Sequence, residues 1–483
     1  MFFGVIMCMY LFVVFLCIFC MILSTAEPPL DKGFIPWLGH AVEFGKDAAS
    51  FLNRMKRKHG DIFTVHVAGR YVTVLLDPHS YDSVLSDSES LDFTAYAQVL
   101  MERIFDLRLP HDQLTKAKEI MKRNFVEISL DSMNGTMRRH LQALLKAETP
   151  QNLTDWKEEG LFSFSYSLLF KAGYLTLFGG EQNNNPNDPS RVYDEYKTFD
   201  GLLTKMARGT LKAEERKTAQ RVRKRLWGLL APAGLTTDSG SSLWLHNYRQ
   251  LLEEGGADEE TQEKAVFMQL WATQGNVGPA AFWLLSYLLM NPEALAAVEG
   301  ELTHISQMEA SDSSHTPLFD SALEETLRLT AAPFITREVV QEKTLHMANG
   351  REYALRKGDR VCLFPFISPQ MDPEIFHEQQ KFKYDRFLNE DRSVKRDFYK
   401  GGRRLKYYTM PWGAGTNGCV GKQFAIKTIR QFVHTLLTSY ELELCDPHAQ
   451  MPEINPSRYG FGMLQPERDL LVRYRPKHTR CEH

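Results

Sequence analysis

The glycine-rich segment around Cys419 constrains the fold of this chain more than any other stretch of it. Four glycines surround the cysteine in the sequence PWGAGTNGCVG, which runs from position 411 to 421. Apolar residues then recur at helical spacing, at Ile429, Phe432, Val433, Leu436 and Leu437. The pattern predicts a loop that carries a thiol to the start of a helix.

A thiol at this place has several possible roles. The helix dipole and the free backbone N–H groups favour the thiolate over the thiol, and glycines let a bulky planar group approach the backbone. An isolated cysteine is otherwise most often a small buried apolar residue. The loop has no C-x-x-C spacing for zinc and no neighbouring histidine for a catalytic pair. A single axial thiolate for haem iron explains the glycines and the aromatic Trp412 together.

The segment from Trp412 to Gly421 resembles the haem-binding loop of the cytochrome P450 family. The usual family pattern is F-x-x-G-x-R-x-C-x-G, and this chain has W-x-x-G-x-N-x-C-x-G. The resemblance implies a mainly α fold with small β-sheets, in which haem lies between a long central helix and the cysteine loop with its helix. It implies haem b (iron protoporphyrin IX) as cofactor, with Cys419 as metal ligand and catalytic residue. Residues 27–483 would form one catalytic domain, although length alone suggests about three domains.

Glu325 and Arg328 resemble the E-x-x-R pair of the same family, and Arg386 matches the third member of that group. Taken alone, a Glu and an Arg three residues apart share a helix face and usually form a solvated surface pair. Because they precede the cysteine loop in the family's order, the resemblance implies a buried structural cluster that braces the loop.

Two positions of the loop depart from the family pattern. Trp412 replaces the usual phenylalanine and keeps an aromatic ring beside the sulfur. Asn417 stands where most members have an arginine that binds a haem propionate, so other cations must take that role. Arg337 is the first candidate, with Lys116 and Lys118 as weaker ones, and each is equally well explained as an ordinary surface charge.

The most apolar internal segment is Ala265–Met290. Its hydropathy alone fits a second membrane span, but the polar side chains within it are costly in lipid. We interpret it as one helix buried in the middle of a soluble domain. These polar side chains are Gln269, Thr273, Gln274 and Asn276.

Gly275 and Asn276 occupy the positions at which oxygen-activating members of the family carry an acid and a threonine. An amide can orient a polar ligand, but it does not relay protons as a carboxyl group does. Pro279 lacks the N–H that would bond the carbonyl of Gly275, which predicts a distorted helix beside Asn276. The alternative role for Asn276 is to satisfy a carbonyl freed at the kink.

A haem-thiolate enzyme without proton delivery suits a substrate that already contains an O–O bond. The segments 270–283, 331–337 and 458–462 are most similar to the branch of the family that acts on such a substrate. The resemblance implies a monomeric isomerase that converts prostaglandin H2, a lipid endoperoxide, to prostacyclin without O2, NADPH or a redox partner. A sterol or bile-acid hydroxylase of the same branch is the alternative, and a haem-binding sensor without catalysis is a third possibility.

Asn276 would bind the endoperoxide, and the lipid tail of the substrate needs an apolar channel. Each further candidate for the lining is equally well explained as an ordinary core residue. These candidates are Trp271, Ala272, Gly275, Tyr96, Phe334, Thr336 and Leu464.

The first residues, Met1–Leu23, contain no charged side chain and are long enough to cross a bilayer as a helix. We expect residues 1–26 to form a single-pass anchor, although Ser24 to Ala26 would also serve as a signal-peptide cleavage site. Basic residues follow the run, which favours a catalytic domain on the cytosolic face of the endoplasmic reticulum. Glycosylation sequons at Asn134 and Asn152 would then be silent.

The remaining sequence gives mostly exclusions. Lys and Arg number 57 against 60 Asp and Glu, so no basic surface for nucleic acid is expected. Runs at 62–68 and 71–76, separated by Gly69, predict a β-hairpin. Polar loops are expected at 182–189 and 309–317. Cys362, Cys445 and Cys481 have no assigned role, and no disulfide framework is implied.

Overall fold

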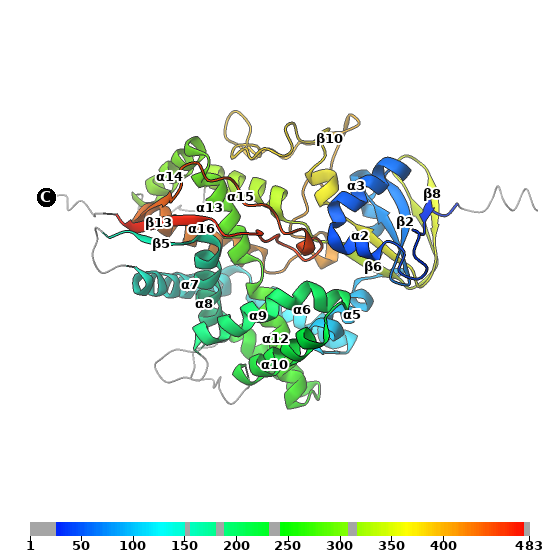
Figure 1. The fold of residues 1–483 in the computed structure, drawn as a ribbon, viewed down its shortest axis with the longest axis horizontal. Helices are drawn as coiled ribbons and strands as arrows, with labels where there is room; N and C mark the ends of the chain where they lie inside the picture. The colour runs from blue at the N-terminus through cyan, green and yellow to red at the C-terminus, as the bar shows by residue number, and fades with distance from the viewer. Residues whose placement is uncertain (1–25, 150–154, 180–187, 231–241, 308–315, 478–483) are drawn as a thin grey trace, which may run out of the picture.

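A computed structural model describes residues 26–149, 155–179, 188–230, 242–307 and 316–477. The expected anchor at 1–26 lies outside the described residues except for Ala26, as do the sequon at Asn152, Cys481 and most of both predicted polar loops. Figure 1 shows the largest group of strands at the end of the molecule where the described chain begins, while helices make up most of the rest. This arrangement confirms the expected mainly α fold with small β-sheets. The longer helices are α3 (Ala48–His59), α5 (Phe93–Phe105), α6 (His111–Asn124), α7 (Glu127–Glu148), α8 (Leu161–Phe178), α9 (Pro189–Arg208), α10 (Ala213–Leu229), α11 (Leu243–Glu254), α12 (Glu259–Gln274), α13 (Val277–Leu289), α14 (Pro292–Gln307), α15 (Pro317–Thr330) and α16 (Lys422–Ser439).

The largest sheet has six strands in the order β1-β2-β3-β9-β6-β4. The predicted hairpin is confirmed, because β2 and β3 pair antiparallel with Ile62 opposite Leu75. Gly69 turns the chain between them at φ +77°, where a Cβ would lie 2.7 Å from the indole nitrogen of Trp37. The short helices α2 (Ala41–Lys46) and α4 (Asp82–Leu85) accompany this sheet, whose strands are β1 (Leu30–Asp31), β2 (Ile62–Val67), β3 (Arg70–Leu75), β4 (Leu91–Asp92), β6 (Ile335–Val339) and β9 (Arg360–Leu363).

A second sheet joins distant parts of the chain at the other end of the molecule (Figure 1). Its central strand is β13 (Leu471–Pro476), which pairs antiparallel with β12 (Tyr440–Leu444) on one side and with β5 (Lys157–Gly160) on the other. Two hairpins complete the strands: β7 (Lys343–His346) with β8 (Glu352–Leu355), and β10 (Tyr399–Lys400) with β11 (Arg403–Arg404).

The core that carries the central helices is made by α7, α8, α13, α15 and α16, which pack around Trp283 and Phe282. Among the described residues, α8 is the single helix that is long and apolar enough to cross a membrane, and 72% of it is buried inside the molecule. The segment α12–α13 passes the same test only together with α14, at a bend of 114°. Their burial identifies α8 and α13 as helices of the protein core.

The segment interpreted as one helix, Ala265–Met290, is instead two helices, α12 and α13, which meet at Gly275 and Asn276. The expected distortion beside Asn276 is therefore confirmed, and it is large enough to divide the predicted helix in two. Because Pro279 has no N–H, the carbonyl of Gly275 accepts its bond from the Tyr166 hydroxyl of α8, at 3.4 Å. The break places Asn276 directly before α13, as its N-cap residue.

Candidate functional site

One cavity of about 400 Å³ lies between the break in the central helix and the start of α16. Its size is within the range of small-molecule sites, and its walls are mainly apolar. Cys419, Trp412, Asn417, Asn276 and Arg337 all reach its surface, although they come from three separate parts of the chain. The structure therefore brings together the thiol, the loop and the central helix that the sequence placed in one site.

Cys419 lies on the cavity wall three residues before α16 begins at Lys422. Its backbone N–H donates to the carbonyl of Trp412 at 2.8 Å, which closes the loop. Gly413 and Gly415 hold the loop's turns at φ +67° and +66°. The two glycines give the backbone a shape that residues with a Cβ rarely adopt.

The thiol of Cys419 is open to the cavity, and its partial burial among the lining residues raises its pKa. The N–H groups of Gly421 and Lys422 and the charge of Lys422 act in the opposite direction. The expected effect of the helix start on the Cys419 pKa is therefore present, and burial acts against it. A bound metal ion would supply the missing stabilisation of the thiolate.

The residues present fit a haem group. Within the described ranges, no group of three or more His, Cys, Asp or Glu side chains could hold a metal ion, so a metal at Cys419 has to bring its other ligands with it. A planar, largely apolar cofactor does so, and the apolar cavity with its glycine loop can receive one.

Two cations mark one edge of the cavity. Arg337 is buried on its wall, with the guanidinium donating to the carbonyl of Thr336 at 3.0 Å and lying 5.1 Å from the centre of the Phe93 ring. Lys118 of α6 donates to Oδ1 of Asn417 at 3.1 Å and to the carbonyl of Thr416.

Burial, together with the charges of Lys122 and Arg337, lowers the pKa of Lys118. Two cations that repel each other beside a cavity are suited to an anionic group such as a propionate. Neither Lys118 nor Lys116 is part of the cavity wall itself. Lys116, in contrast to Lys118, is 63% exposed and forms its ion pair with Asp112 at 3.2 Å rather than bonding the loop.

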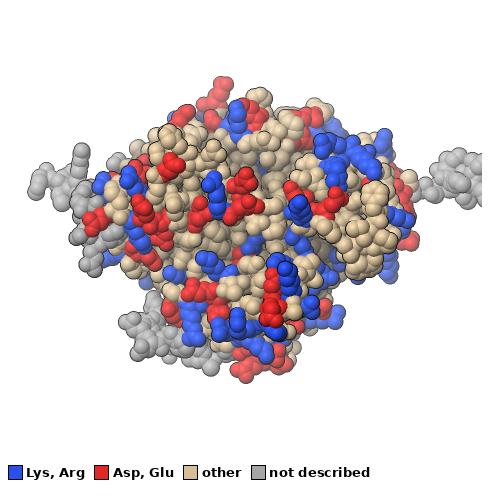
Figure 2. All heavy atoms as spheres, in the orientation of Figure 1, with Lys and Arg blue, Asp and Glu red and all other residues tan. Residues whose placement is uncertain are grey.

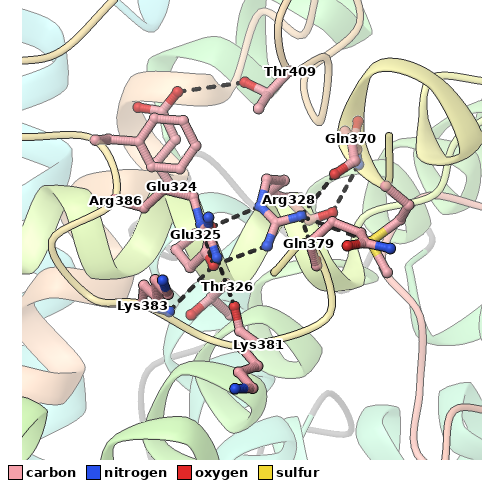
Figure 3. A network of polar contacts seen from close by, with 12 residues as sticks. Glu324, Glu325, Thr326, Arg328, Gln370, Gln379, Lys381, Lys383, Arg386 and Thr409 are labelled. Atoms are coloured by element: carbon pink, nitrogen blue, oxygen red, sulfur yellow. Dashed lines mark hydrogen bonds and ion pairs between the residues drawn. The ribbon is translucent and has the colours of Figure 1, made fainter. Parts of the chain in front are cut away.

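The cluster formed by Glu325, Arg328 and Arg386 is shown in Figure 3. Glu325 accepts from Nε and Nη2 of Arg328 at 2.7 and 2.8 Å, and from Nε of Arg386 at 2.8 Å. Glu325 and Arg328 are completely buried. Both guanidinium groups also donate to backbone carbonyls of residues 370–381, so the charges are fully satisfied.

Gln370 connects this cluster to the cysteine loop, and sequence reasoning missed it. Its carbonyl accepts from Arg328 at 2.7 Å, its Nε2 donates to the carbonyls of Arg328 and Ala331, and its Oε1 accepts from the N–H of Met410 at 3.3 Å. Met410 directly precedes the loop. No local pattern marks Gln370, because its role depends on partners about 40 residues away in both directions.

Asn276 lines the cavity but does not satisfy the carbonyl freed at the kink, which accepts from Tyr166 instead. The Oδ1 atom of Asn276 accepts from the backbone N–H of Met463 at 2.9 Å. The alternative role that the sequence left open is therefore not the one that the structure shows.

The candidate substrate residues separate into two groups. Ala272 and Phe334 line the cavity together with Asn276. Thr273 and Gln269 also line it, one and two helical turns before Asn276 respectively, and helical spacing from Asn276 would have found them.

The other five candidates are not part of the cavity wall. They lie behind it or beside it in the packed interior. Three of them contact aromatic residues: Trp271 packs against Phe105 with ring centres 5.5 Å apart, Gly275 lies close to the Tyr196 hydroxyl, and the carbonyl of Leu464 accepts from Trp283. Thr336 donates to the sulfur of Cys362, and Tyr96 lies under the guanidinium of Arg360.

Comparison with known proteins agrees with this geometry. Residues 28–472 match the family model of cytochrome P450. The chain is 54% identical to a prostacyclin synthase of Bos taurus over 469 residues, and 53% identical to that of Rattus norvegicus, with 93% of this chain and 94% of each relative covered. It is 40% identical to a human 7-alpha-hydroxycholest-4-en-3-one 12-alpha-hydroxylase, with 93% of each chain covered.

Proposed function

The chain belongs to the cytochrome P450 family, and from that premise we propose that it is a haem-thiolate isomerase which converts prostaglandin H2 to prostacyclin. The observation that carries the proposal is the position of Asn276. Where oxygen-activating members of the family place an acid and an alcohol, this chain has Gly275 and Asn276, and the amide of Asn276 lies on the cavity wall. An amide supplies a hydrogen bond but no relayed proton, which suits a substrate that already contains its oxygen atoms.

Cys419 would ligate the iron of haem b, and Arg337, Lys118 and Asn417 would hold the propionates at the edge of the cavity. Iron with a thiolate ligand supplies the electron donation that favours cleavage of an O–O bond. Trp412 shields the sulfur from water. Asn276 binds the endoperoxide, while the apolar surfaces of Ala272 and Phe334 receive the lipid tail.

The location of the enzyme follows from its N-terminal sequence. Residues 1–26 serve as a single-pass anchor in the endoplasmic reticulum membrane, and residues 27–483 form the catalytic domain on the cytosolic face. Asn134 is buried, which supports an unmodified sequon. The enzyme acts as a monomer.

On the face drawn in Figure 2, basic and acidic side chains are interspersed, apart from basic side chains gathered at the end where α3 and β2 lie.

The decisive experiment is to add prostaglandin H2 to the purified ferric holoenzyme without NADPH, O2 or a reductase. We expect prostacyclin, detected as its stable hydrolysis product, at a rate that haem alone does not reach. No turnover under these conditions would refute the isomerase. The matched variant is Cys419→Ser, which should lose both the turnover and the thiolate-specific band of the reduced carbon monoxide complex.

A sterol or bile-acid hydroxylase is the second candidate, because the relative named as a 12-alpha-hydroxylase is also 40% identical over 93% of this chain. It predicts a different requirement in the same assay. A sterol would be consumed only when NADPH, a reductase and O2 are all present.

A further inference from the structure

The segment from Arg458 to Gln465 forms part of the cavity wall through Gly462 and Met463. One carboxylate of α9 holds both of its ends. Asp200 accepts from Arg458 at 2.6 and 3.0 Å and from Nε2 of Gln465 at 2.9 Å. Arg458 and Asp200 are both buried, so separating them would leave an uncompensated charge inside the protein.

Backbone hydrogen bonds fix the segment between these ends. The carbonyl of Gly462 accepts from the N–H of Ala332 at 2.9 Å, and the N–H of Leu464 donates to the carbonyl of Thr330, also at 2.9 Å. Both partners belong to the junction between α15 and β6. The N–H of Met463 is therefore a donor whose position is set before any ligand binds.

This donor determines which way the amide of Asn276 points. An N–H group needs an oxygen as acceptor, so the bond from Met463 assigns Oδ1 to the segment. The other arm of the amide, Nδ2, has no hydrogen-bond partner among the residues that the structure describes. Since Asn276 lines the cavity, its two Nδ2 hydrogens are available to a ligand there.

Gly462 leaves the space that this arrangement needs. A Cβ at position 462 would lie 2.5 Å from Oδ1 of Asn276, and the backbone has φ +92°, a conformation that favours glycine. Any side chain at this position would have to displace the amide or the segment.

We propose that Gly462 and Met463 are positioning residues that hold Asn276 as a hydrogen-bond donor toward one bridge oxygen of the endoperoxide, with Asp200 anchoring the segment that carries them. The proposal rests on the proposed isomerase function for the identity of the ligand. It assigns Asn276 one polarity: it donates to the substrate and accepts from the protein.

The contact is tested by amide hydrogen exchange on the ferric holoenzyme, resolved between Met463 and Leu464. Asn276→Leu has a similar volume but no acceptor. We expect exchange at Met463 to become at least about tenfold faster, because its hydrogen bond is lost. Exchange at Leu464, which bonds Thr330 in both proteins, is the internal control and stays the same. An unchanged rate at Met463 would overturn the proposal.

The polarity is tested with two stable bicyclic analogues of prostaglandin H2, in each of which CH2 replaces one of the two bridge oxygens. Affinities are measured by optical titration of the ferric holoenzyme. Asn276→Leu and Gly462→Ala should each weaken binding of one analogue about tenfold and of the other less than about twofold, since a single hydrogen bond is lost. Equal weakening of both analogues would reduce Gly462 to a structural role and overturn the proposal.

The double variant Asn276→Leu with Gly462→Ala completes a double-mutant cycle for analogue affinity. If Gly462 acts through Asn276, the second substitution causes no further loss of affinity. A further tenfold loss would contradict this. Turnover of prostaglandin H2 by the wild type is measured in parallel. If the wild type is inactive but exchange at Met463 changes as expected, only the isomerase function is refuted. If the wild type is active but exchange at Met463 is unchanged in Asn276→Leu, only the positioning role is refuted.

Discussion

At the scale of single residues, the cations at the cavity edge have different surroundings although they are close in sequence or in space. Lys118 bonds the loop at Asn417 and Thr416, whereas Lys122, one turn later on the same helix, pairs with Glu119 in solvent at 2.7 Å. The two lysines therefore form a matched pair: one faces the site and the other does not.

Lys118→Met should accelerate loss of haem about tenfold, which corresponds to about 1.4 kcal/mol for one charge-assisted contact that is partly open to solvent. Lys122→Met should lose haem at the wild-type rate. Transfer of haem to an excess of apomyoglobin measures both rates. If the Lys118 variant also kept the wild-type rate, Lys118 would have no part in holding the cofactor.

Glu324 lies next to the buried cluster on α15 but has a different environment. It accepts one long hydrogen bond, 3.4 Å from the Thr409 hydroxyl, and burial raises its pKa although Lys422 and Arg396 oppose the shift (Figure 3). A carboxyl whose folded pKa is raised stabilises the folded state below its unfolded pKa, and that stability is lost as the pH rises through the folded pKa.

Glu324→Gln should therefore be more stable than the wild type at pH 7 and equally stable near pH 4, where the carboxyl is protonated in both states. Urea unfolding of the holoenzyme at the two pH values measures the difference. A variant that is less stable than the wild type at pH 7 would show that the ionised carboxylate is favourable where it lies.

At the scale of elements, the contact between α8 and α13 depends on one glycine. A Cβ at Gly278 would lie 2.5 to 2.7 Å from Tyr166, partly from its backbone, which cannot move aside. The same close approach brings the hydroxyl of Tyr166 to the carbonyl of Gly275. The sequence alone does not reveal this role of Gly278, because a contact with α8 leaves no mark in the local pattern.

Gly278→Ala should lower the free energy of unfolding by about 1 to 3 kcal/mol, the usual cost of overpacking. Gly135→Ala is the matched control, since Gly135 lies within α7 with nothing within 4 Å of the added Cβ. That variant should gain up to about 1 kcal/mol from better helix propensity. Urea unfolding compares them, and a Gly278 variant as stable as the wild type would contradict the close packing.

Local patterns predicted what local physics determines. The hairpin at Gly69 and the break near Asn276 follow from glycine and proline, which act on their own backbone. The position of Tyr96 under Arg360, outside the cavity, and the pairing of Asp200 with Arg458 depend on residues more than 200 positions apart. Such contacts have no period that a single sequence reveals.

At the scale of the whole molecule, the domain begins close to the proposed anchor. The carbonyl of Ala26 accepts from the N–H of Ala354, and β1 starts at Leu30. A protein that lacks residues 1–25 should therefore keep its folded domain and its haem. We expect it to leave the carbonate-resistant membrane fraction, and the reduced carbon monoxide spectrum checks its haem. Retention in that fraction would show that other surfaces anchor the protein.

The site itself belongs to the whole chain, because Cys419, Asn276, Arg337 and Lys118 come from different elements. Sequence resemblance placed these residues in one site because the family pattern carries long-range information. It did not supply Gln370 or Met463, since one acts through an interior amide and the other through its backbone, so that side-chain type alone does not identify them.

The central strand of the second sheet, β13, comes later in the chain than every other described element. During synthesis, β5 and β12 therefore leave the ribosome before β13, the strand with which both of them pair. Met463 emerges 187 positions after the Asn276 that it holds. A nascent chain can form the early hairpin and helices while it grows, but it can close its catalytic cavity only when translation is almost finished, so haem insertion has to be a late event in the life of each molecule.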